Sequence, residues 1–255
     1  MSEGREVPAV AVEAARAAAS ILVERYEDAR GPRGLQTKST PTDLVSDADV
    51  AAERAIRDVL ARRRPDDSIL GEEGDEVTGT TGVRWVVDPL DGTVNYLFGI
   101  PQWCVSIACQ GHAAVILDPV REELFEVVAG EAPTLGGRPL QASDRSELST
   151  ALVATGFAYD AAVRARQAEV VANLLPRVAD IRRMGSAALD LAWTAAGRYD
   201  AYYERGVNPW DIAAGAMLCT AGGLEVRELP AREGLPGGIV AGPGALVEQL
   251  YELVG

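Results

Sequence analysis

An apolar run that ends in a cluster of acids constrains this chain more than any other feature. Residues 85–87 are aromatic or β-branched and predict a buried strand that ends at Asp88, and Asp91 follows three residues later. Two carboxylates this close repel each other unless a cation lies between them, and hard oxygen ligands suit Mg²⁺. Gly92 and Thr93 would then open an element whose backbone N–H groups can hold a phosphate. The segment predicts a metal and phosphate site, although Asp-Pro-Leu-Asp-Gly is also good turn chemistry.

Two further acidic motifs lie far from this segment in the sequence. Glu72 and Glu73 stand between glycines upstream, and Asp211 follows Trp210 well downstream. Three separated acidic motifs that serve one metal cluster are much rarer by chance than one acidic turn, so together they favour the metal site. Glu73 is the weaker partner of its pair, with an outer or purely structural role. Taken alone, Asp211 could equally be an ordinary helix N-cap.

The length of the chain allows one large domain or two tightly packed subdomains. At 255 residues it can bury a substantial core, and no Ser/Gly-rich or Pro-rich tract separates its parts. We expect an N-terminal α+β subdomain at 1–145 that carries the metal-binding motifs. A C-terminal α/β subdomain at 146–255 would complete the site, and the whole would form one compact unit.

The charge balance narrows the choice of partners. The chain has 24 basic and 38 acidic residues, a net charge of −14 and a pI near 4.6. Nucleic-acid affinity depends largely on Lys and Arg, so no general nucleic-acid partner is expected. An anionic substrate could approach such a protein only with help from bound cations.

The N-terminal segment, the lengths of the apolar runs and the cysteines predict an intracellular protein. Residues 1–10 lack the apolar core of a secretory signal, and no apolar run could span a bilayer, so we expect a cytoplasmic protein without membrane contact. Three cysteines without paired spacing predict reduced, buried thiols. His112, the only histidine, falls in an expected hairpin turn, so a histidine-based mechanism has no candidate.

Hydrophobic periodicity predicts a mixed α/β class in which helices and strands alternate in layers. The expected helices and strands are as follows: helices at 7–26, 47 or 49–63, 161–175, 186–196 and 211–220, and strands at 68–70, 84–87, 103–109, 113–117, 124–128, 151–155, 180–184 and 200–203.

The three acidic motifs resemble the signature of the inositol monophosphatase family, Mg²⁺-dependent and Li⁺-sensitive phosphatases. The family includes relatives that act on fructose bisphosphate, histidinol phosphate and adenosine bisphosphates. The resemblance begins near residues 38–45 and continues to about Gly223. It implies the layered αβαβα sandwich of this family, two or three Mg²⁺ ions per active site, and a homodimer.

The resemblance also implies a set of metal ligands. Glu72, Asp88 and the backbone carbonyl of Leu90 would hold one metal. Asp88, Asp91 and Asp211 would hold another, with Asp88 as the bridge. Two such metals can activate a water on one side of phosphorus and stabilise the leaving alkoxide on the other, so no covalent nucleophile is needed.

Catalytic support is implied at two further positions. Thr93 resembles the threonine that orients the attacking water together with Glu72, and Asp49 matches the acid that supports this threonine. Without the resemblance, Asp49 is equally well explained as a helix N-terminal acid. Val94 stands where the family has a second threonine, and the hairpin around Gly111 is short for the family.

The substrate end of the site is implied by two segments. Gly185, Ser186 and Ala187 match a segment that contacts the substrate ring, or else form a simple strand-to-helix turn. Glu204 lies seven residues before Asp211, a spacing at which inositol monophosphatases have an acid that accepts hydrogen bonds from ring hydroxyls. Asp211 is itself expected to lie against the substrate.

The sequence therefore predicts a Mg²⁺-dependent phosphomonoesterase that acts on myo-inositol monophosphate or a similar polyol or sugar phosphate. One alternative is a sibling phosphatase for fructose 1,6-bisphosphate, histidinol phosphate or an adenosine bisphosphate. A second phosphate would favour a basic cluster such as Arg182 and Arg183, which could also be a solvated pair. An alternative of another class is a regulatory or RNA-associated binding protein that keeps the fold.

Overall fold

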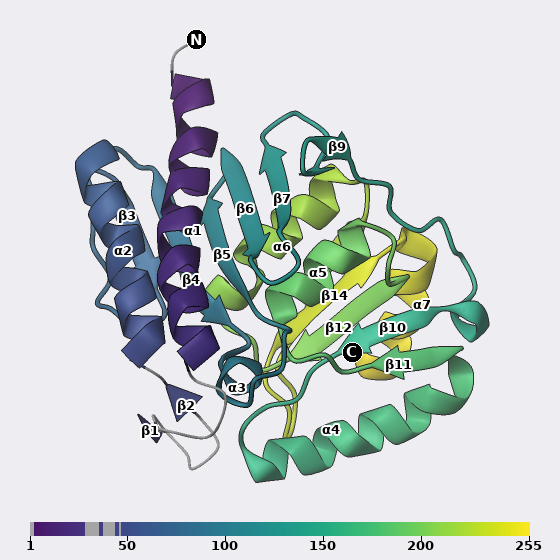
Figure 1. Ribbon diagram of the computed structural model, residues 1–255. Helices are drawn as coiled ribbons and strands as arrows, with labels where there is room; N and C mark the ends of the chain where they lie inside the picture. The colour runs from purple at the N-terminus through teal and green to yellow at the C-terminus, as the bar shows by residue number, and fades with distance from the viewer. Residues whose placement is uncertain (1–2, 29–35, 38–43, 46) are drawn as a thin grey trace.

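The computed structural model describes residues 3–28, 36–37, 44–45 and 47–255, arranged in five layers (Figure 1). Helices α1 (Glu3–Asp28) and α2 (Asp47–Arg63) cover the outer face of a first sheet. Helices α5 (Ala187–Ala195) and α6 (Pro209–Ala221) fill the space between this sheet and a second one. The predicted αβαβα sandwich is confirmed. Most of the first segment of the resemblance, 38–43, lies outside the described residues.

The first sheet has seven strands. Its first pair is parallel and all its other neighbours are antiparallel. In sheet order the strands are β3 (Ser68–Gly71), β4 (Arg84–Asp91), β5 (Cys104–Cys109), β6 (Ala113–Asp118), β7 (Glu123–Val128), β8 (Thr134–Leu135) and β9 (Arg138–Pro139).

The second sheet has five strands and mixed pairing. Strand β10 runs parallel to both of its neighbours, while β14 is antiparallel to both of its own. In sheet order the strands are β11 (Asp180–Arg182), β10 (Leu152–Thr155), β12 (Ala201–Arg205), β14 (Gly238–Gly242) and β13 (Glu225–Leu229). The remaining elements are α3 (Thr93–Leu97), α4 (Ala161–Leu174), α7 (Gly244–Val254), the short helices at Leu148–Thr150 and Leu175–Arg177, and the paired strands β1 (Gln36–Thr37) and β2 (Leu44–Val45).

Three buried apolar clusters hold the five layers together, and the central cluster contacts both sheets. The first joins α1 and α2 to the first sheet, the second surrounds α5 and α6, and the third lies between the second sheet and helices α4 and α7. Because α5 and α6 are covered on both faces, their sequences are largely apolar and include many alanines. These central helices bring residues from 187–221 against the first sheet, where the acids of the first half lie.

Most expected elements are confirmed, and two details differ. Helix α6 begins at Pro209, because proline suits the first helical position, so Asp211 is its third residue and not its first. Glu204 lies within β12 and not after it. Among the strands and α-helices, α3, β1, β2, β8, β9, β13, β14 and α7 were not predicted.

Other expectations about side chains are also met. All three cysteines are buried and free, and His112 is exposed in the turn between β5 and β6. No helix in the described part of the chain is both long and apolar enough to cross a membrane. The division into subdomains at residue 145 stays a prediction.

A buried carboxylate fastens the edge of the first sheet to α2. Asp67 is 2 % exposed and accepts hydrogen bonds from Arg64 Nε at 2.8 Å, Thr81 Oγ1 at 2.6 Å and Trp85 Nε1 at 2.9 Å. Burial alone would raise the pKa of Asp67, but these hydrogen bonds outweigh burial and lower it. The contacts fix the start of β4, the strand that carries Asp88 and Asp91.

We expect Asp67→Asn to lower the free energy of unfolding by about 2 to 4 kcal/mol at pH 7, because an amide cannot accept from all three donors. A lowered pKa stabilises the native state above the ordinary pKa of an aspartate, and this contribution is lost as the pH falls through the folded-state value. The difference between the two proteins in urea denaturation should therefore shrink in acid. The exposed neighbour Asp66 provides the control variant Asp66→Asn, and an equal loss in both variants would contradict this account.

Candidate active site

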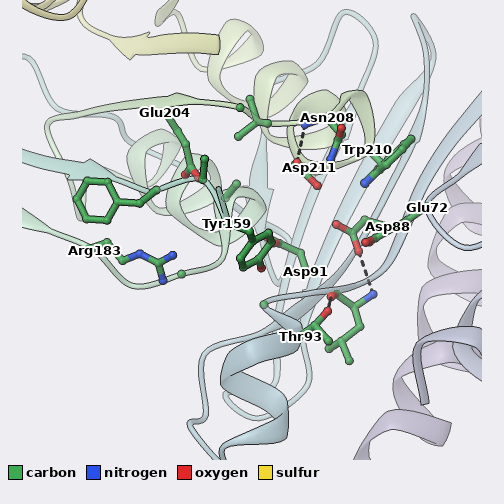
Figure 2. Close-up of a pocket in the computed structure, with 18 residues that line it drawn as sticks. Glu72, Asp88, Asp91, Thr93, Tyr159, Arg183, Glu204, Asn208, Trp210 and Asp211 are labelled. Atoms are coloured by element: carbon green, nitrogen blue, oxygen red, sulfur yellow. Dashed lines mark hydrogen bonds between the residues drawn. The ribbon is translucent and has the colours of Figure 1, made fainter. Parts of the chain in front are cut away.

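A pocket of about 310 Å³ opens between the two halves of the fold, and polar side chains line most of it (Figure 2). The first half contributes the ends of β3 and β4 and the start of α3, and the second half contributes β12 and the starts of α5 and α6. Among the sequence-predicted site residues, those that line it are Glu72, Asp88, Leu90, Asp91, Gly92, Thr93, Gly185, Ala187, Glu204 and Asp211. Asp49 and Ser186 lie behind the lining.

A bulge in β4 sets the relative positions of its two acids. Side chains three residues apart on a regular strand point to opposite faces. Here Asp88 pairs with Ser106 and Asp91 with Cys104, so three steps along β4 match only two along β5. The extra residue falls at Pro89 or Leu90, consistent with the preference of proline for bulges. As a result both carboxylates line the same pocket, and the Leu90 N–H donates to Asp88 Oδ1 at 3.0 Å.

Asp91 joins the first half of the fold to α5. Its Oδ2 accepts from Ser186 Oγ at 2.6 Å and from the N–H of Ala188 at 2.7 Å. Ser186 is 1 % exposed and also caps α5, so its hydroxyl positions Asp91 and does not face the pocket. Gly185, at φ 88°, makes the turn before the helix, and Asn95 Nδ2 donates to the carbonyl oxygen of Met184 at 2.8 Å.

The hydroxyl of Thr93 lies between two acceptors. It is 3.1 Å from Asp49 Oδ1 and 3.0 Å from the carbonyl oxygen of Leu90. Asp49 is 1 % exposed on α2, so a helix acid from the N-terminal part of the chain reaches the pocket edge. The predicted pairing of Asp49 with Thr93 is present in the structure. Gly92, at φ 97°, gives the chain the sharp turn from β4 into α3.

Glu72 and Asp211 complete the acidic side of the pocket. Glu72 follows β3 and lies beside Asp88 (Figure 2). Asp211 accepts from the N–H of Asn208 at 2.6 Å, which holds its carboxylate at the start of α6 (Figure 2).

The opposite end of the pocket holds Glu204 and Arg183 (Figure 2). Tyr202 lies two residues before Glu204 on β12 and donates its hydroxyl to Glu204 Oε2 at 2.9 Å. A Cβ atom at position 156 would collide with the Glu204 carboxylate, so Gly156 is required to leave room for it. Burial raises the pKa of Glu204 to about 7, although the hydrogen bond from Tyr202 and the charge of Arg183 oppose the shift.

Comparisons with known proteins identify the family of the chain. The model of the inositol monophosphatase family matches residues 3–254. The chain belongs to the inositol monophosphatase family. Inositol-1-monophosphatase SuhB of Mycobacterium tuberculosis is 44 % identical over 238 residues, which cover 88 % of this chain and 82 % of the relative. Nus factor SuhB of Escherichia coli K12 is 39 % identical over 249 residues, which cover 94 % and 92 %.

The fold agrees equally well with solved structures of the family. The extragenic suppressor protein suhB of Bartonella henselae superimposes with a TM-score of 0.87 at 35 % identity, over 97 % of each chain. Membership supports a phosphatase activity, and the family is generally metal-dependent.

The electrostatics of the pocket call for a cation, as expected in a metal-dependent family. Burial and the neighbouring charges of Glu72, Asp91 and Asp211 raise the pKa of Asp88 well above its ordinary value. Burial, followed by the charge of Asp91, raises the pKa of Asp211 well above its ordinary value. Burial also raises the pKa of Asp91 to about 6. Arg183 is the only basic residue that lines the pocket within the described residues.

The donor atoms fit a hard divalent cation, because they are all carboxylate or carbonyl oxygens. As they stand, no three His, Cys, Asp or Glu side chains in the described ranges are arranged as the ligands of one ion. Three of these carboxylates accept hydrogen bonds from protein N–H or hydroxyl donors instead, as described above for Asp88, Asp91 and Asp211. The residues therefore supply the oxygen ligands and the negative charge that a divalent cation needs, while hydrogen bonds within the protein hold their side chains.

Sequence reasoning missed the residues that hold the site residues in place. Glu53, Gly156 and Tyr202 contact a predicted site residue or the loop that carries it, yet none of them belongs to a recognisable motif. Glu53 had one available signal, because it lies four residues after Asp49 and therefore on the same face of α2. Tyr202 could have been found from strand alternation, since residues two apart share a face.

Crowded buried carboxylates should make the metal-free protein less stable, and Asp88→Asn tests this. The raised pKa of Asp88 means that its charged form is disfavoured in the native state, so the penalty is present at high pH and disappears as the pH falls. In a chelator at pH 8, we expect the melting temperature of the variant to lie about 2 to 4 °C above that of the wild type. In a domain of this size, such a shift corresponds to ~1 kcal/mol in the free energy of unfolding. The Asn oxygen can still accept from Leu90, so a lower melting temperature than the wild type would contradict the repulsion. Asp144→Asn, at an exposed position, is the control.

Proposed function

We propose that the protein is a Mg²⁺-dependent phosphomonoesterase that hydrolyses myo-inositol monophosphate or a similar polyol phosphate. One observation carries the proposal: four acids from three distant segments line a single pocket in a chain of the inositol monophosphatase family. The name of the Mycobacterium tuberculosis relative supports inositol phosphate as the first substrate to test.

In this proposal two or three Mg²⁺ ions occupy the acidic side of the pocket. Glu72, Asp88 and the carbonyl of Leu90 would hold one ion, and Asp88, Asp91 and Asp211 another. Bound Mg²⁺ would neutralise the phosphate and lower the pKa of a water that attacks phosphorus. Li⁺ is expected to inhibit the enzyme, because its radius is similar to that of Mg²⁺ and its charge is lower.

Thr93 and Asp49 would orient the attacking water. A hydroxyl carries one proton, so Thr93 can donate fully to only one of its two acceptors, Asp49 or the carbonyl of Leu90. If the Leu90 carbonyl were a ligand of the cation, the Thr93 hydroxyl would donate its hydrogen bond to Asp49, and its lone pairs would be free to accept from water. The buried carboxylate of Asp49 thus fixes the direction of the hydroxyl, while Glu72 accepts the proton of the same water.

The leaving group would lie toward Glu204. Gly92 and Thr93 would hold the phosphate, and Gly185 and Ala187 would contact the polyol ring. Glu204 would accept hydrogen bonds from its hydroxyls, and its position at the far end of the pocket from Glu72 and Asp88 supports this division of roles (Figure 2).

A sibling specificity is the alternative within this class. Of the two arginines considered for a second phosphate, only Arg183 lines the pocket, whereas Arg182 is exposed and pairs with Asp180 at 2.5 Å. A single guanidinium favours a monophosphate over fructose 1,6-bisphosphate or an adenosine bisphosphate, and leaves histidinol phosphate to be tested. A homodimer and a cytoplasmic location belong to the same proposal.

A regulatory role is the second candidate, because the Escherichia coli relative is named Nus factor SuhB. The net charge of −14 argues against broad affinity for RNA, and the full set of acids argues against lost catalysis. A salt-dependent RNA shift assay beside a phosphate-release assay would separate the two functions, which need not exclude each other.

Phosphate release from inositol monophosphate should stop in a chelator and return with Mg²⁺. In Mg²⁺, Asp88→Asn should lower kcat at least ~10³-fold, which corresponds to about 4 kcal/mol of transition-state stabilisation, because the bridging ligand is lost. Circular dichroism should show an intact fold. Full activity in the chelator, or a tenth of wild-type activity in the variant, would refute the metal mechanism. Insensitivity to Li⁺ would leave that mechanism intact.

Glu204 should control substrate choice and not the chemical step. For Glu204→Ala we expect kcat/KM for inositol phosphate to fall about tenfold to a hundredfold, since one charge-assisted hydrogen bond is worth roughly 1.5 to 3 kcal/mol. A small aryl phosphate without ring hydroxyls should be nearly unaffected. Tyr202→Phe is the matched control, because it removes only the donor to Glu204. Equal losses for both substrates would place Glu204 in support of the fold or the metal site.

A further inference from the structure

One buried acid on α2 is not used by the proposed mechanism. Glu53 is 2 % exposed, although it lies on a helix whose other face is in solvent. Its Oε1 accepts from Arg57 Nε at 2.7 Å and from the N–H of Gly74 at 2.8 Å, and its Oε2 accepts from the N–H of Glu73 at 2.7 Å. Both carboxylate oxygens are therefore engaged, and two of the three donors are backbone groups of the loop that follows β3.

The glycines of this loop are shaped to receive the same carboxylate. A Cβ atom at position 71 would collide with the carboxylate of Glu53, and one at Gly74 would lie 2.7 Å from its Oε1. Neither glycine has a positive φ, so close approach and not backbone conformation explains both of them. The Gly-Glu-Glu-Gly motif thus has two glycines because a buried side chain lies against its backbone.

The loop is fixed at two places, and Glu72 lies between them. At its base, Ile69 and Val77 exchange two backbone hydrogen bonds of 2.9 Å. At its tip, Glu53 holds the N–H groups of the two residues that follow Glu72. Pairing of Gly71 with Val87 in the sheet holds the backbone before Glu72, and the Glu53 anchor holds the backbone after it.

We propose that Glu53 is a positioning residue that holds the Glu72 loop and thereby sets the affinity of the site for Mg²⁺. The proposal rests on the proposed function for its metal, and on the hydrogen bonds above for its geometry. Glu53 does not line the pocket, so its effect passes through Glu72. Changes to residues that orient a metal ligand typically weaken metal binding about 10- to 100-fold.

The test compares Glu53→Gln and Glu53→Ala with the wild type. Calorimetric titration with Mg²⁺ should show a Kd raised about tenfold or more, while kcat at saturating Mg²⁺ stays within about threefold. In the metal-free protein, hydrogen exchange of the amides at 73 and 74 should become faster. Glu53→Gln preserves volume and loses at least one loop hydrogen bond, so it keeps the test valid if Glu53→Ala does not fold.

Two controls separate positioning from helix stability. Arg57→Gln removes the helical partner of Glu53 and leaves both loop hydrogen bonds, and Asp58→Asn changes an exposed acid on the same helix. Neither should change the Kd for Mg²⁺. In a Glu72→Gln background, Glu53→Ala should add less than about a twofold change, because residues that act through one contact are not additive.

The proposal is overturned if the wild type binds Mg²⁺ and the Glu53 variants bind it equally well. It is also overturned if Glu53→Ala is as damaging without Glu72 as with it, or if amide exchange at 73 and 74 is unchanged. A wild type that neither binds Mg²⁺ nor releases phosphate refutes the proposed function instead. In that case exchange at 73 and 74 still tests the part of the inference that concerns the loop.

Discussion

The mutual repulsion of like charges in one pocket is the constraint on which the rest of the structure depends. Glu72, Asp88, Asp91 and Asp211 come from three distant parts of the chain and meet in one pocket, where burial makes the charges of the three aspartates costly. The mutual repulsion of their charges opposes this meeting. The apolar clusters between the layers supply the opposing free energy, and the central helices carry the acid of the second half to those of the first.

Hydrogen bonds behind the pocket then fix each carboxylate or its backbone individually. Ser186 and the start of α5 hold Asp91, and the N–H of Asn208 holds Asp211. Helix α2 supports the site at two points one turn apart, since Asp49 reaches Thr93 and Glu53 reaches the loop of Glu72. A single helix outside the first sheet thus supports two neighbouring parts of the pocket edge.

The sequence predicted the acids that line the pocket and most of the helices and strands because both leave local signals, whereas the layered arrangement was implied by the family resemblance. Buried strands that end in acids, and helices with apolar periodicity, can be recognised from neighbouring residues alone. The position of Ser186 could not be predicted in this way, because its hydroxyl faces Asp91, which lies in another layer. The helix start at Pro209 was recognisable in principle, whereas Glu53 resembles any other acid on an exposed helix until the loop that it contacts is placed.

The bulge in β4 restricts how this part of the chain can change in length. At their spacing of three residues, Asp88 and Asp91 share a face only because one residue between them has no counterpart on β5. A deletion of Pro89 or Leu90 would make the strand regular, and at a spacing of two residues both acids would still share a face, but the carbonyl between them would turn into the sheet ladder. A single insertion would leave two residues of β4 without counterparts on β5 and would therefore enlarge the bulge. Pairing with β5 therefore fixes the length of this segment.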